Sequence, residues 1–334
     1  MSKRISLPIP FGWFGIAFSA ELAPGEVKPL KYFGKELVLF RTESGEAKVL
    51  DAFCPHLGAH LGHGGKVRGE SLACPFHGWE FNGAGTCTAV PYAKNMPPKV
   101  AGGKQAVYAY PVIERNQVIW AWYHPQRIEP TYELHEISEF ADPDWAPIEK
   151  MEWIIHTSIQ ETAENAVDAA HFIFVHGTPD MPVGDSMFDG TTRSSKYTMN
   201  VPWIGDDGSF DPNRQNPIHL HSVSNGSGNA YQRFSGAMNV VMMGLPVPID
   251  ENTMKLHFVF TQRKDATDAQ KMLAFGAQME LKSQVEADMP IWENKIYLEK
   301  PTLCDGDGPI HQYRKWFSQF YAETDGPAVI RAVG

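Results

Sequence analysis

One stretch of the sequence concentrates side chains that bind soft or borderline metal ions. Between residues 54 and 77 the chain reads CPHLGAHLGHGGKVRGESLACPFH, which contains six cysteine or histidine residues. Thiolates and imidazoles are the usual protein ligands of zinc and of iron–sulfur clusters. The six candidates are Cys54, His56, His60, His63, Cys74 and His77.

The spacing selects two mixed pairs from these candidates. Cys54 and His56 form a Cys-x-His pair, and after seventeen further residues Cys74 and His77 form a Cys-x-x-His pair. Structural zinc sites usually pair cysteine with cysteine and histidine with histidine. In a Rieske [2Fe–2S] centre, by contrast, one iron takes both cysteines and the other takes both histidines. Because each loop then delivers one ligand to each iron, the mixed pairs favour an iron–sulfur cluster over zinc.

A second polar group lies downstream, in the segment ETAENAVDAAHFIFVHG. We expect residues 157–174 to form a helix, on which Glu164, Asp168 and His171 share one face at positions i, i+4 and i+7. Asn165 lies beside them, and the flanking residues are alanine, valine and phenylalanine, which are typical of a buried surface. Burial of carboxylates and imidazole without partners is costly, so a metal ion or a hydrogen-bond network is expected here.

A second histidine extends this group toward a metal site. His176 follows His171 by five residues, too far round a helix to share its face, so we expect the helix to unwind near Phe174 or Val175. Two converging imidazoles need a third ligand, and non-haem Fe(II) oxygenases take it from a carboxylate, which leaves positions open for O₂.

The element pattern divides the chain into two parts and predicts an α+β protein. Short strands separated by turns occupy residues 13–123, including hairpins over 35–53 and 105–123. We therefore predict an all-β domain over 1–125 and a second domain, with an antiparallel sheet and helices, over 126–334. Within the second domain the expected elements are loops that cover a pocket at 179–217, strands at 230–249 and 252–264, and a long helix that begins near Asp265 or Asp268 and continues to 300.

Composition excludes several other functions. The 334 residues are 43% hydrophobic and 20% charged, which is ordinary for a globular protein, and the formal charge of −10 argues against nucleic-acid binding. The apolar stretch after the start is broken by prolines and no run reaches membrane-spanning length, so we expect a cytoplasmic protein. Four cysteines, two of them beside histidines, fit a metal site in a reducing compartment.

The first motif resembles that of a known family. CPHLGAHL…CPFHGWEFNGAGTC is closely similar to the cluster-binding motif of the Rieske-type oxygenases, including the glycine and tryptophan after the second histidine. The resemblance implies a [2Fe–2S] cluster and leaves His60 and His63 as bystanders. The ligands that it implies are Cys54, His56, Cys74 and His77.

The second motif, D-x-x-H-x-x-x-x-H, resembles the same family. The resemblance implies that His171 and His176 bind a catalytic Fe(2+) together with a distant aspartate, for which Asp288 is the best match. It also implies that Asp168 carries electrons between His171 and His77 of a neighbouring subunit in a homotrimer. Asn165, beside that aspartate, joins the expected catalytic set. The competing carboxylates for the third iron ligand are Glu280, Glu286 and Glu293.

Within this family, ENAVDAAHF and the segment from 288 to 321 look most like the oxygenase component of 3-ketosteroid 9α-hydroxylase and its sterol-oxidising relatives. That resemblance implies a helix-grip catalytic domain that uses O₂ to hydroxylate or desaturate a hydrophobic, steroid-like substrate. No dinucleotide-binding motif is present, so NAD(P)H would act only through a separate flavin reductase, with or without a ferredoxin. The alternatives are an aromatic-acid hydroxylase or O-demethylase of the same family and a non-catalytic Rieske electron carrier.

An apolar pocket for such a substrate is compatible with the sequence. An apolar strand around residues 238–245 could face residues of the long helix across the pocket, although for each single residue a place in the hydrophobic core is the simpler expectation. The helix residues concerned are Met272, Phe275, Met279 and Trp292.

Overall fold

The structure is a computed structural model that describes residues 5, 7–178, 184–207 and 209–322. The chain forms two compact units. The β unit is Trp13–Thr131, and the sheet–helix unit consists of the described residues of Met1–Gly12 and Tyr132–Gly334. No helix within these described ranges is long and apolar enough to cross a membrane.

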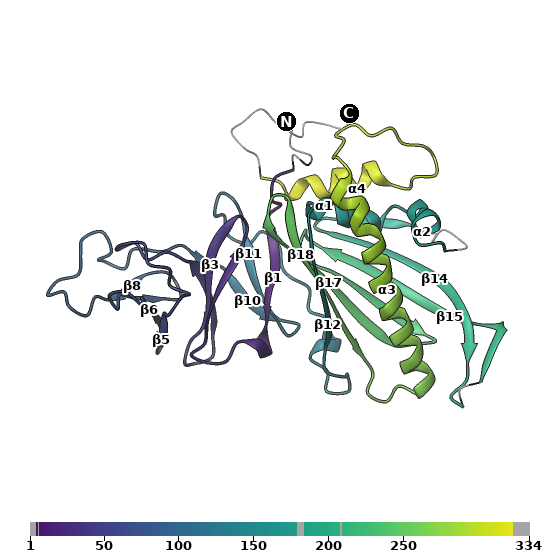
Figure 1. Ribbon diagram of the computed structural model, residues 1–334, viewed down its shortest axis with the longest axis horizontal. Helices are drawn as coiled ribbons and strands as arrows, with labels where there is room; N and C mark the ends of the chain where they lie inside the picture. Colours follow the sequence, from purple (N-terminus) through teal and green to yellow (C-terminus); the bar gives the residue numbers. More distant parts are fainter. Residues whose placement is uncertain (1–4, 6, 179–183, 208, 323–334) are drawn as a thin grey trace. The chain divides into compact units, whose positions relative to one another are not determined.

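Three small sheets build the β unit, with strand orders β1-β11-β10, β2-β3-β4-β9 and β5-β6-β7-β8 (Figure 1). Apart from one short 3₁₀ turn, η1 (Ser19–Glu21), the unit contains strands and loops, as the sequence predicts. The strands are β1 (Gly12–Phe18), β2 (Val27–Tyr32), β3 (Lys35–Arg41), β4 (Ala47–Asp51), β5 (Lys66–Arg68), β6 (Ser71–Ala73), β7 (Glu80–Asn82), β8 (Cys87–Ala89), β9 (Ala109–Tyr110), β10 (Val112–Arg115) and β11 (Val118–Tyr123).

Both predicted hairpins are confirmed. The turn between β3 and β4 contains Gly45, whose φ of 100° lies in the left-handed region that glycine adopts without strain. The turn between β10 and β11 places Asn116 and Gln117 at φ of 55° and 62°, which matches the twist of a two-residue hairpin.

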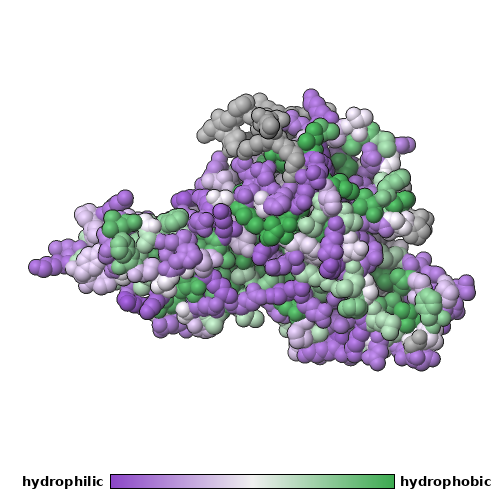
Figure 2. Space-filling view, viewed as in Figure 1, coloured by the Kyte–Doolittle hydropathy of each residue, from purple (hydrophilic) through white to green (hydrophobic). Residues whose placement is uncertain are grey.

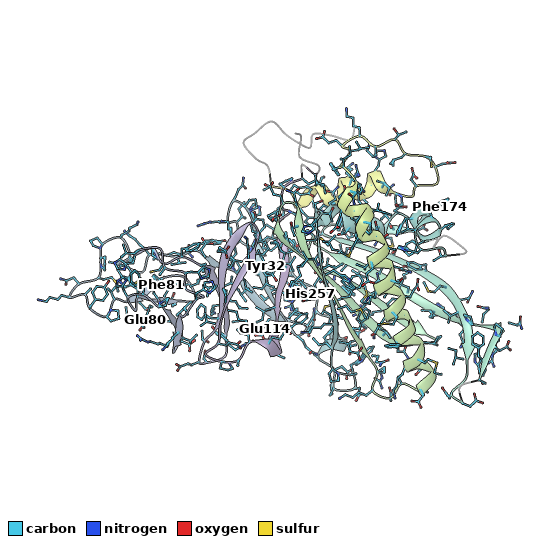
Figure 3. All side chains as sticks on the ribbon, in the orientation of Figure 1. Tyr32, Glu80, Phe81, Glu114, Phe174 and His257 are labelled. Atoms are coloured by element: carbon cyan, nitrogen blue, oxygen red, sulfur yellow. The ribbon has the colours of Figure 1, made fainter. Side chains whose placement is uncertain are left out.

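The core of the β unit lies directly under the cysteine–histidine loops. Leu61, Leu72 and Phe81 are fully buried, and Phe81 is labelled in Figure 3. Cys54 and Cys74 belong to the same group of packed side chains. The two loops are therefore fixed by the hydrophobic packing that stabilises the unit.

One antiparallel sheet of seven strands dominates the other unit, in the order β12-β18-β17-β16-β15-β14-β13. The helix α3 (Asp268–Asn294) lies across its strands in Figure 1, an arrangement that agrees with the predicted sheet and helices. The strands are β12 (Glu149–Ile155), β13 (Ser186–Asp189), β14 (Thr192–Ile204), β15 (Phe210–Asn225), β16 (Ala230–Gly236), β17 (Val240–Asp250) and β18 (Thr253–Gln262).

The loops predicted over 179–217 are wrong for most of their length. Residues 179–183 lie outside the described ranges, but β13, β14 and the first half of β15 occupy much of the rest. Thirteen Cα pairs link β14 to β15, from Thr192–Asn225 to Ile204–Phe210. Polar and turn-forming residues indicated loops, yet strands pair through backbone N–H and C=O groups, which every residue except proline carries in full.

The continuous helix predicted over 157–174 is also wrong. The segment folds as α1 (Ile159–Ala163), η3 (Glu164–Ala166) and, after a break, α2 (Ala170–Phe174). The Asp168 carboxylate accepts hydrogen bonds from the backbone N–H groups of Ala170 and His171, and such local bonds favour a helix start over a helix interior. The expected end of the helix at Phe174 is confirmed.

The long helix begins as predicted and ends earlier. Thr267 and Gln270 form a capping box at its start, and the helix ends at Asn294 rather than at 300. Met272, Phe275 and Met279 are exposed, so both interpretations of these residues, in the pocket wall or in the core, are wrong. The remaining short helices of this unit are η2 (Ser138–Phe140), α4 (Ile310–Phe317) and η4 (Ser318–Phe320).

The capping box gives a test of the fold. Thr267→Ala removes the hydroxyl that accepts from the Gln270 N–H, and loss of such a cap costs about 1 kcal/mol. We expect the thermal unfolding midpoint, followed by circular dichroism, to fall by about 2–4 °C. Thr267→Ser keeps the hydroxyl and serves as the control. An equal fall in both variants would contradict the role of the cap.

Candidate metal centres and substrate cavity

The two cysteine–histidine loops have the same backbone construction. In the first loop the N–H of Gly58 donates to the carbonyl of Cys54 at 2.9 Å, and in the second the N–H of Gly78 donates to that of Cys74 at 3.0 Å. Both glycines have φ near 70°, at 74° and 69°, where other residues are strained. A proline follows each cysteine. Each loop is thus a closed turn that holds its ligands in place.

These loops bring the four predicted ligands of the iron–sulfur cluster together. We call Cys54, His56, Cys74 and His77 the cluster set. Both thiols are buried, the two imidazole centroids are 4.8 Å apart, and the Nδ1 atom of each ring is buried without a hydrogen-bond partner. Burial, with the second thiol nearby, raises the pKa of Cys54 to about 12.

Bound iron would stabilise the two buried thiols as thiolates and would give the two unpartnered ring nitrogens a ligand bond. It would supply the positive charge that stabilises two buried thiolates, and it would coordinate the two orphan ring nitrogens. The residues present therefore fit a [2Fe–2S] cluster.

An aromatic pair supports the loops from one side. The indole of Trp79 stacks on the His56 ring with a centroid separation of 4.6 Å and an interplanar angle of 7°. Its Nε1 donates to the hydroxyl of Tyr92 at 2.8 Å. The tryptophan that follows the second loop thus fixes the orientation of a histidine in the first.

The other histidines and cysteines of the first motif and of the chain lie outside the cluster set. His60 Nδ1 accepts from the Gly62 N–H at 3.0 Å, so His60 is a hydrogen-bonded loop residue. The sequence favours buried apolar positions for the two remaining cysteines, Cys87 and Cys304. Cys87 is buried, which agrees, whereas Cys304 is exposed, which does not.

A second group of potential ligands lies in the sheet–helix unit. One ligand atom from each of His171, His176 and Asp288 lies within 4.8 Å of the others, and we call these residues the metal triad. His176 Nε2 is 3.5 Å from a carboxylate oxygen of Asp288, and the two imidazole centroids are 5.1 Å apart. Two imidazoles and a carboxylate are the donor set of a mononuclear non-haem iron site.

The break between η3 and α2 orients the first ligand of the triad. His171 Nδ1 lies 2.6 Å from the backbone carbonyl oxygen of Asp168, so Nδ1 carries the proton and donates it. The other ring nitrogen, Nε2, is then free for a metal. The Asp168 carboxylate lies 3.8 Å from Nδ1, farther than the backbone carbonyl of the same residue.

A chain of side chains orients the carboxylate of the triad. Asn165 Nδ2 donates to Asp288 Oδ2 at 2.8 Å, and the Trp292 indole N–H donates to Asn165 Oδ1 at 3.4 Å. Burial raises the pKa of Asp288 even though the two histidines oppose the shift. A metal cation would offset that desolvation, so the triad fits an iron ion.

Hydrogen bonds elsewhere engage the competing carboxylates. Glu286 pairs with Lys282, Glu280 accepts from Gln284, and Glu293 accepts from the backbone of His156. Of the four candidates for the third ligand, Asp288 is the one that lies with the two histidines.

The polar stripe expected on one helical face does not exist. Because the helix breaks before Asp168, Glu164 faces another network, in which Arg314 donates two hydrogen bonds to its carboxylate at 2.7 and 2.9 Å. That ion pair links η3 to α4. Sequence reasoning missed Arg314, since nothing local marks an arginine 150 residues away as a partner.

A cavity of about 420 Å³ lies beside the metal triad. The sheet supplies one wall and α3 another, and Trp292 lines the cavity, as the sequence predicts. This volume is within the range of small-molecule sites. Apolar lining residues include Met242, Pro246, Leu256, Phe258, Leu281 and Val285.

Burial and nearby charges shift the pKa of His171, the first ligand of the metal triad, in opposite directions. Burial lowers the pKa of His171, but the nearby carboxylates of Asp168 and Asp288 outweigh it, so the pKa lies above its ordinary value. The same pairing holds the pKa of the Asp168 carboxyl below its usual range. Negative charge thus collects around the imidazoles, as a cation site requires.

Comparison with known families agrees with this geometry. Residues 12–111 match the Rieske [2Fe–2S] domain, and residues 121–321 match the 3-ketosteroid 9α-hydroxylase C-terminal domain. The fold and the two candidate centres are those of a Rieske-type oxygenase, an oxidoreductase that uses a [2Fe–2S] cluster and non-haem iron. The chain belongs to the family defined by the 3-ketosteroid 9α-hydroxylase C-terminal domain.

Individual relatives cover most of the chain. A cholesterol 7-desaturase of Xenopus laevis is 32% identical over 94% of this chain and 72% of its own length. The oxygenase component of a 3-ketosteroid-9-alpha-monooxygenase of Rhodococcus rhodochrous is also 32% identical, over 94% of this chain and 84% of its own. A crystal structure of dicamba monooxygenase bound to dicamba shares the fold, with a TM-score of 0.70, 18% identity and coverage of 92% and 96%.

Iron and sulfide analysis tests the two centres separately. The purified protein should contain about three iron atoms and about two acid-labile sulfides per chain. Asp288→Ala should lower iron to about two and leave sulfide unchanged, because it removes one ligand of the metal triad alone.

The matched variant is Cys74→Ser, which removes one ligand of the cluster set. It should lower sulfide and the cluster absorbance together. Unchanged iron in Asp288→Ala, with the fold intact by circular dichroism, would contradict the assignment of the triad.

Proposed function

We propose that this protein is the terminal oxygenase component of a multicomponent Rieske oxygenase that hydroxylates or desaturates a hydrophobic, steroid-like substrate. The observation that carries the proposal is the metal triad at the wall of a largely apolar cavity. The relatives are named for cholesterol desaturation and for ketosteroid monooxygenation, and both names refer to fused-ring substrates.

In this proposal the metal triad binds Fe(2+), which supplies open coordination positions for O₂ when it is bound. Asp168 holds the proton of His171 on Nδ1 through its backbone carbonyl, and Asn165 holds the Asp288 carboxylate through its amide. The apolar wall of the cavity excludes water and binds the rings of the substrate. Asn165 is thus a positioning residue.

Electrons come from outside the chain in this proposal. A flavin reductase, with or without a ferredoxin, oxidises NAD(P)H and reduces the [2Fe–2S] cluster that the cluster set would hold. His56 and His77, whose side chains are only partly buried, are its route for electrons in this proposal. The Asp168 carboxylate, whose side chain is 38% exposed, would accept a hydrogen bond from His77 of a second copy of the chain.

Exposed apolar side chains support an assembly of identical subunits, which we propose to be a homotrimer. Around the cluster set, Phe53, Leu57, Phe76 and Tyr92 are each more than half exposed. In the other unit, Phe174 is 85% exposed at the end of α2; Figure 3 labels it, and Figure 2 shows apolar residues in that region. Exposed aromatic groups beside two redox sites are typical of an interface.

Two alternatives remain distinguishable. A Rieske electron carrier would need no metal triad, and the convergence of three ligands disfavours it. An aromatic-acid hydroxylase or O-demethylase would share the fold of dicamba monooxygenase and would prefer a single-ring substrate. Turnover with a panel of steroids and aromatic acids, in the presence of a surrogate reductase, decides between them. Oxidation of aromatic acids alone would overturn the steroid assignment.

The proposed bridge gives a further prediction. Asp168→Asn keeps an oxygen that can accept from the N–H groups of Ala170 and His171, so α2 should still form. The variant removes the negative charge. We expect the cluster to remain reducible, as followed by its visible absorbance, while substrate oxidation falls by about 100-fold.

Asp206→Asn is the matched control, because it removes one carboxylate from the exposed turn between β14 and β15. It should leave turnover unchanged. Full activity in Asp168→Asn would overturn the bridge.

A further inference from the structure

One arginine of the cavity is buried without a counter-charge. Arg193, on β14, is 2% exposed and lines the cavity beside Ser186 and Ser195. Its Nη2 donates to the Ala166 carbonyl and to the hydroxyls of both serines. Its Nε and Nη1 atoms are buried, and neither has a hydrogen-bond partner among the residues that the structure describes.

Three other arginines of the chain show how a guanidinium is compensated in this protein. Each of the three donates two hydrogen bonds to one glutamate, in the pairs Arg41–Glu114, Arg233–Glu139 and Arg314–Glu164. Arg193 is more deeply buried than these, yet within the described residues no carboxylate lies within ion-pair distance of it. An unpaired buried charge is costly, so such a residue is retained where something else supplies the charge.

The strand register gives the cavity a polar end around this arginine. Arg193 pairs with Ser224, Ser195 pairs with Ser222, and Ser222 pairs with Gln232 on the next strand. These residues share one face of the sheet because side chains alternate along each strand. All of them line the cavity.

The same face becomes apolar farther along the sheet. Gln232 pairs with Met242 on β17, and beyond it Phe258 and Leu256 on β18 line the cavity. From α3, Leu281 and Val285 complete this apolar end. The cavity is therefore amphipathic, with one cationic end and one hydrophobic end.

We propose that Arg193 binds a carboxylate carried by the substrate, so that the protein acts on a hydrophobic acid rather than on a neutral sterol. The inference rests on the proposed function, since it concerns the substrate of the same cavity. Nε and Nη1 carry three N–H bonds for which no acceptor is found among the described residues, and a carboxylate would supply both the acceptors and the missing negative charge.

A neutral carbonyl or hydroxyl would satisfy the donors but not the charge. Burial lowers the pKa of Arg193, but a guanidinium remains protonated in proteins, so the charge persists in the cavity. The hydroxyls of Ser222 and Ser224 and the amide of Gln232 are suited to a second carboxylate oxygen.

The test compares acids with their methyl esters on the iron-loaded protein. Cholanic acid and naphthoic acid, each with its ester, are titrated by calorimetry, and the same four compounds are assayed for oxidation. Where an acid and its methyl ester both bind, we expect the acid to bind at least about 10-fold more tightly than the ester. Equal affinity of acid and ester would overturn the inference.

Two variants test whether Arg193 is the residue that causes the preference for the acid over its ester. Arg193→Gln should abolish the preference for the acid and leave ester binding within about threefold. Lys196→Gln, which removes an exposed cation from the same strand, should retain the preference for the acid. A preference retained in Arg193→Gln would contradict the assignment. If that variant lacks the cluster absorbance or does not fold, the acid–ester comparison on the unmodified protein decides alone.

The outcomes separate this inference from the proposed function. Binding and oxidation of both cholanic compounds without preference would contradict only the role of Arg193. An acid preference in the naphthoic pair alone would contradict the steroid-like substrate and support Arg193. No binding of any of the four compounds would overturn both.

Discussion

The candidate iron site depends on a break in a helix. Between Ala166 and Ala170 the chain leaves the helical path, and the carbonyl of Asp168 thereby becomes free to accept from His171. That single bond places a proton on one ring nitrogen and leaves the other for a metal. In a continuous helix the carbonyl would be used by the backbone N–H four residues later, and the ring would turn freely. The position of the first ligand is therefore set by the backbone.

The rest of the sheet–helix unit holds this break in position. On one side, Arg314 binds Glu164 at the start of η3, and on the other Arg193 binds the Ala166 carbonyl at its end. Across the cavity, α3 presents Asp288 and Trp292, which meet Asn165 from the broken segment. The three residues of η3 are thus held by polar contacts with residues that lie far away in the sequence. The large sheet serves as the rigid support that such a site needs.

Sequence alone predicted what is local and failed where partners are distant. The cluster set was readable because each loop carries its cysteine and histidine within four residues. Asp288 was found only through a family resemblance, since no periodicity links it to His171. The helix break was missed because alanine-rich segments favour helix, while the hydrogen bonds of Asp168 to the next N–H groups favour a cap. Arg193 carried no signal, because it lies among serines and threonines in a segment that the sequence predicted to be loops.

The hydrogen bond from Arg193 to Ala166 has a mechanical consequence. The guanidinium that faces the polar end of the cavity is attached to a peptide two residues before Asp168. A bound carboxylate that moved the guanidinium would also move the backbone that orients His171, because the Ala166 and Asp168 carbonyls are only two residues apart. Occupancy of the polar end of the cavity would then alter the geometry of the metal site.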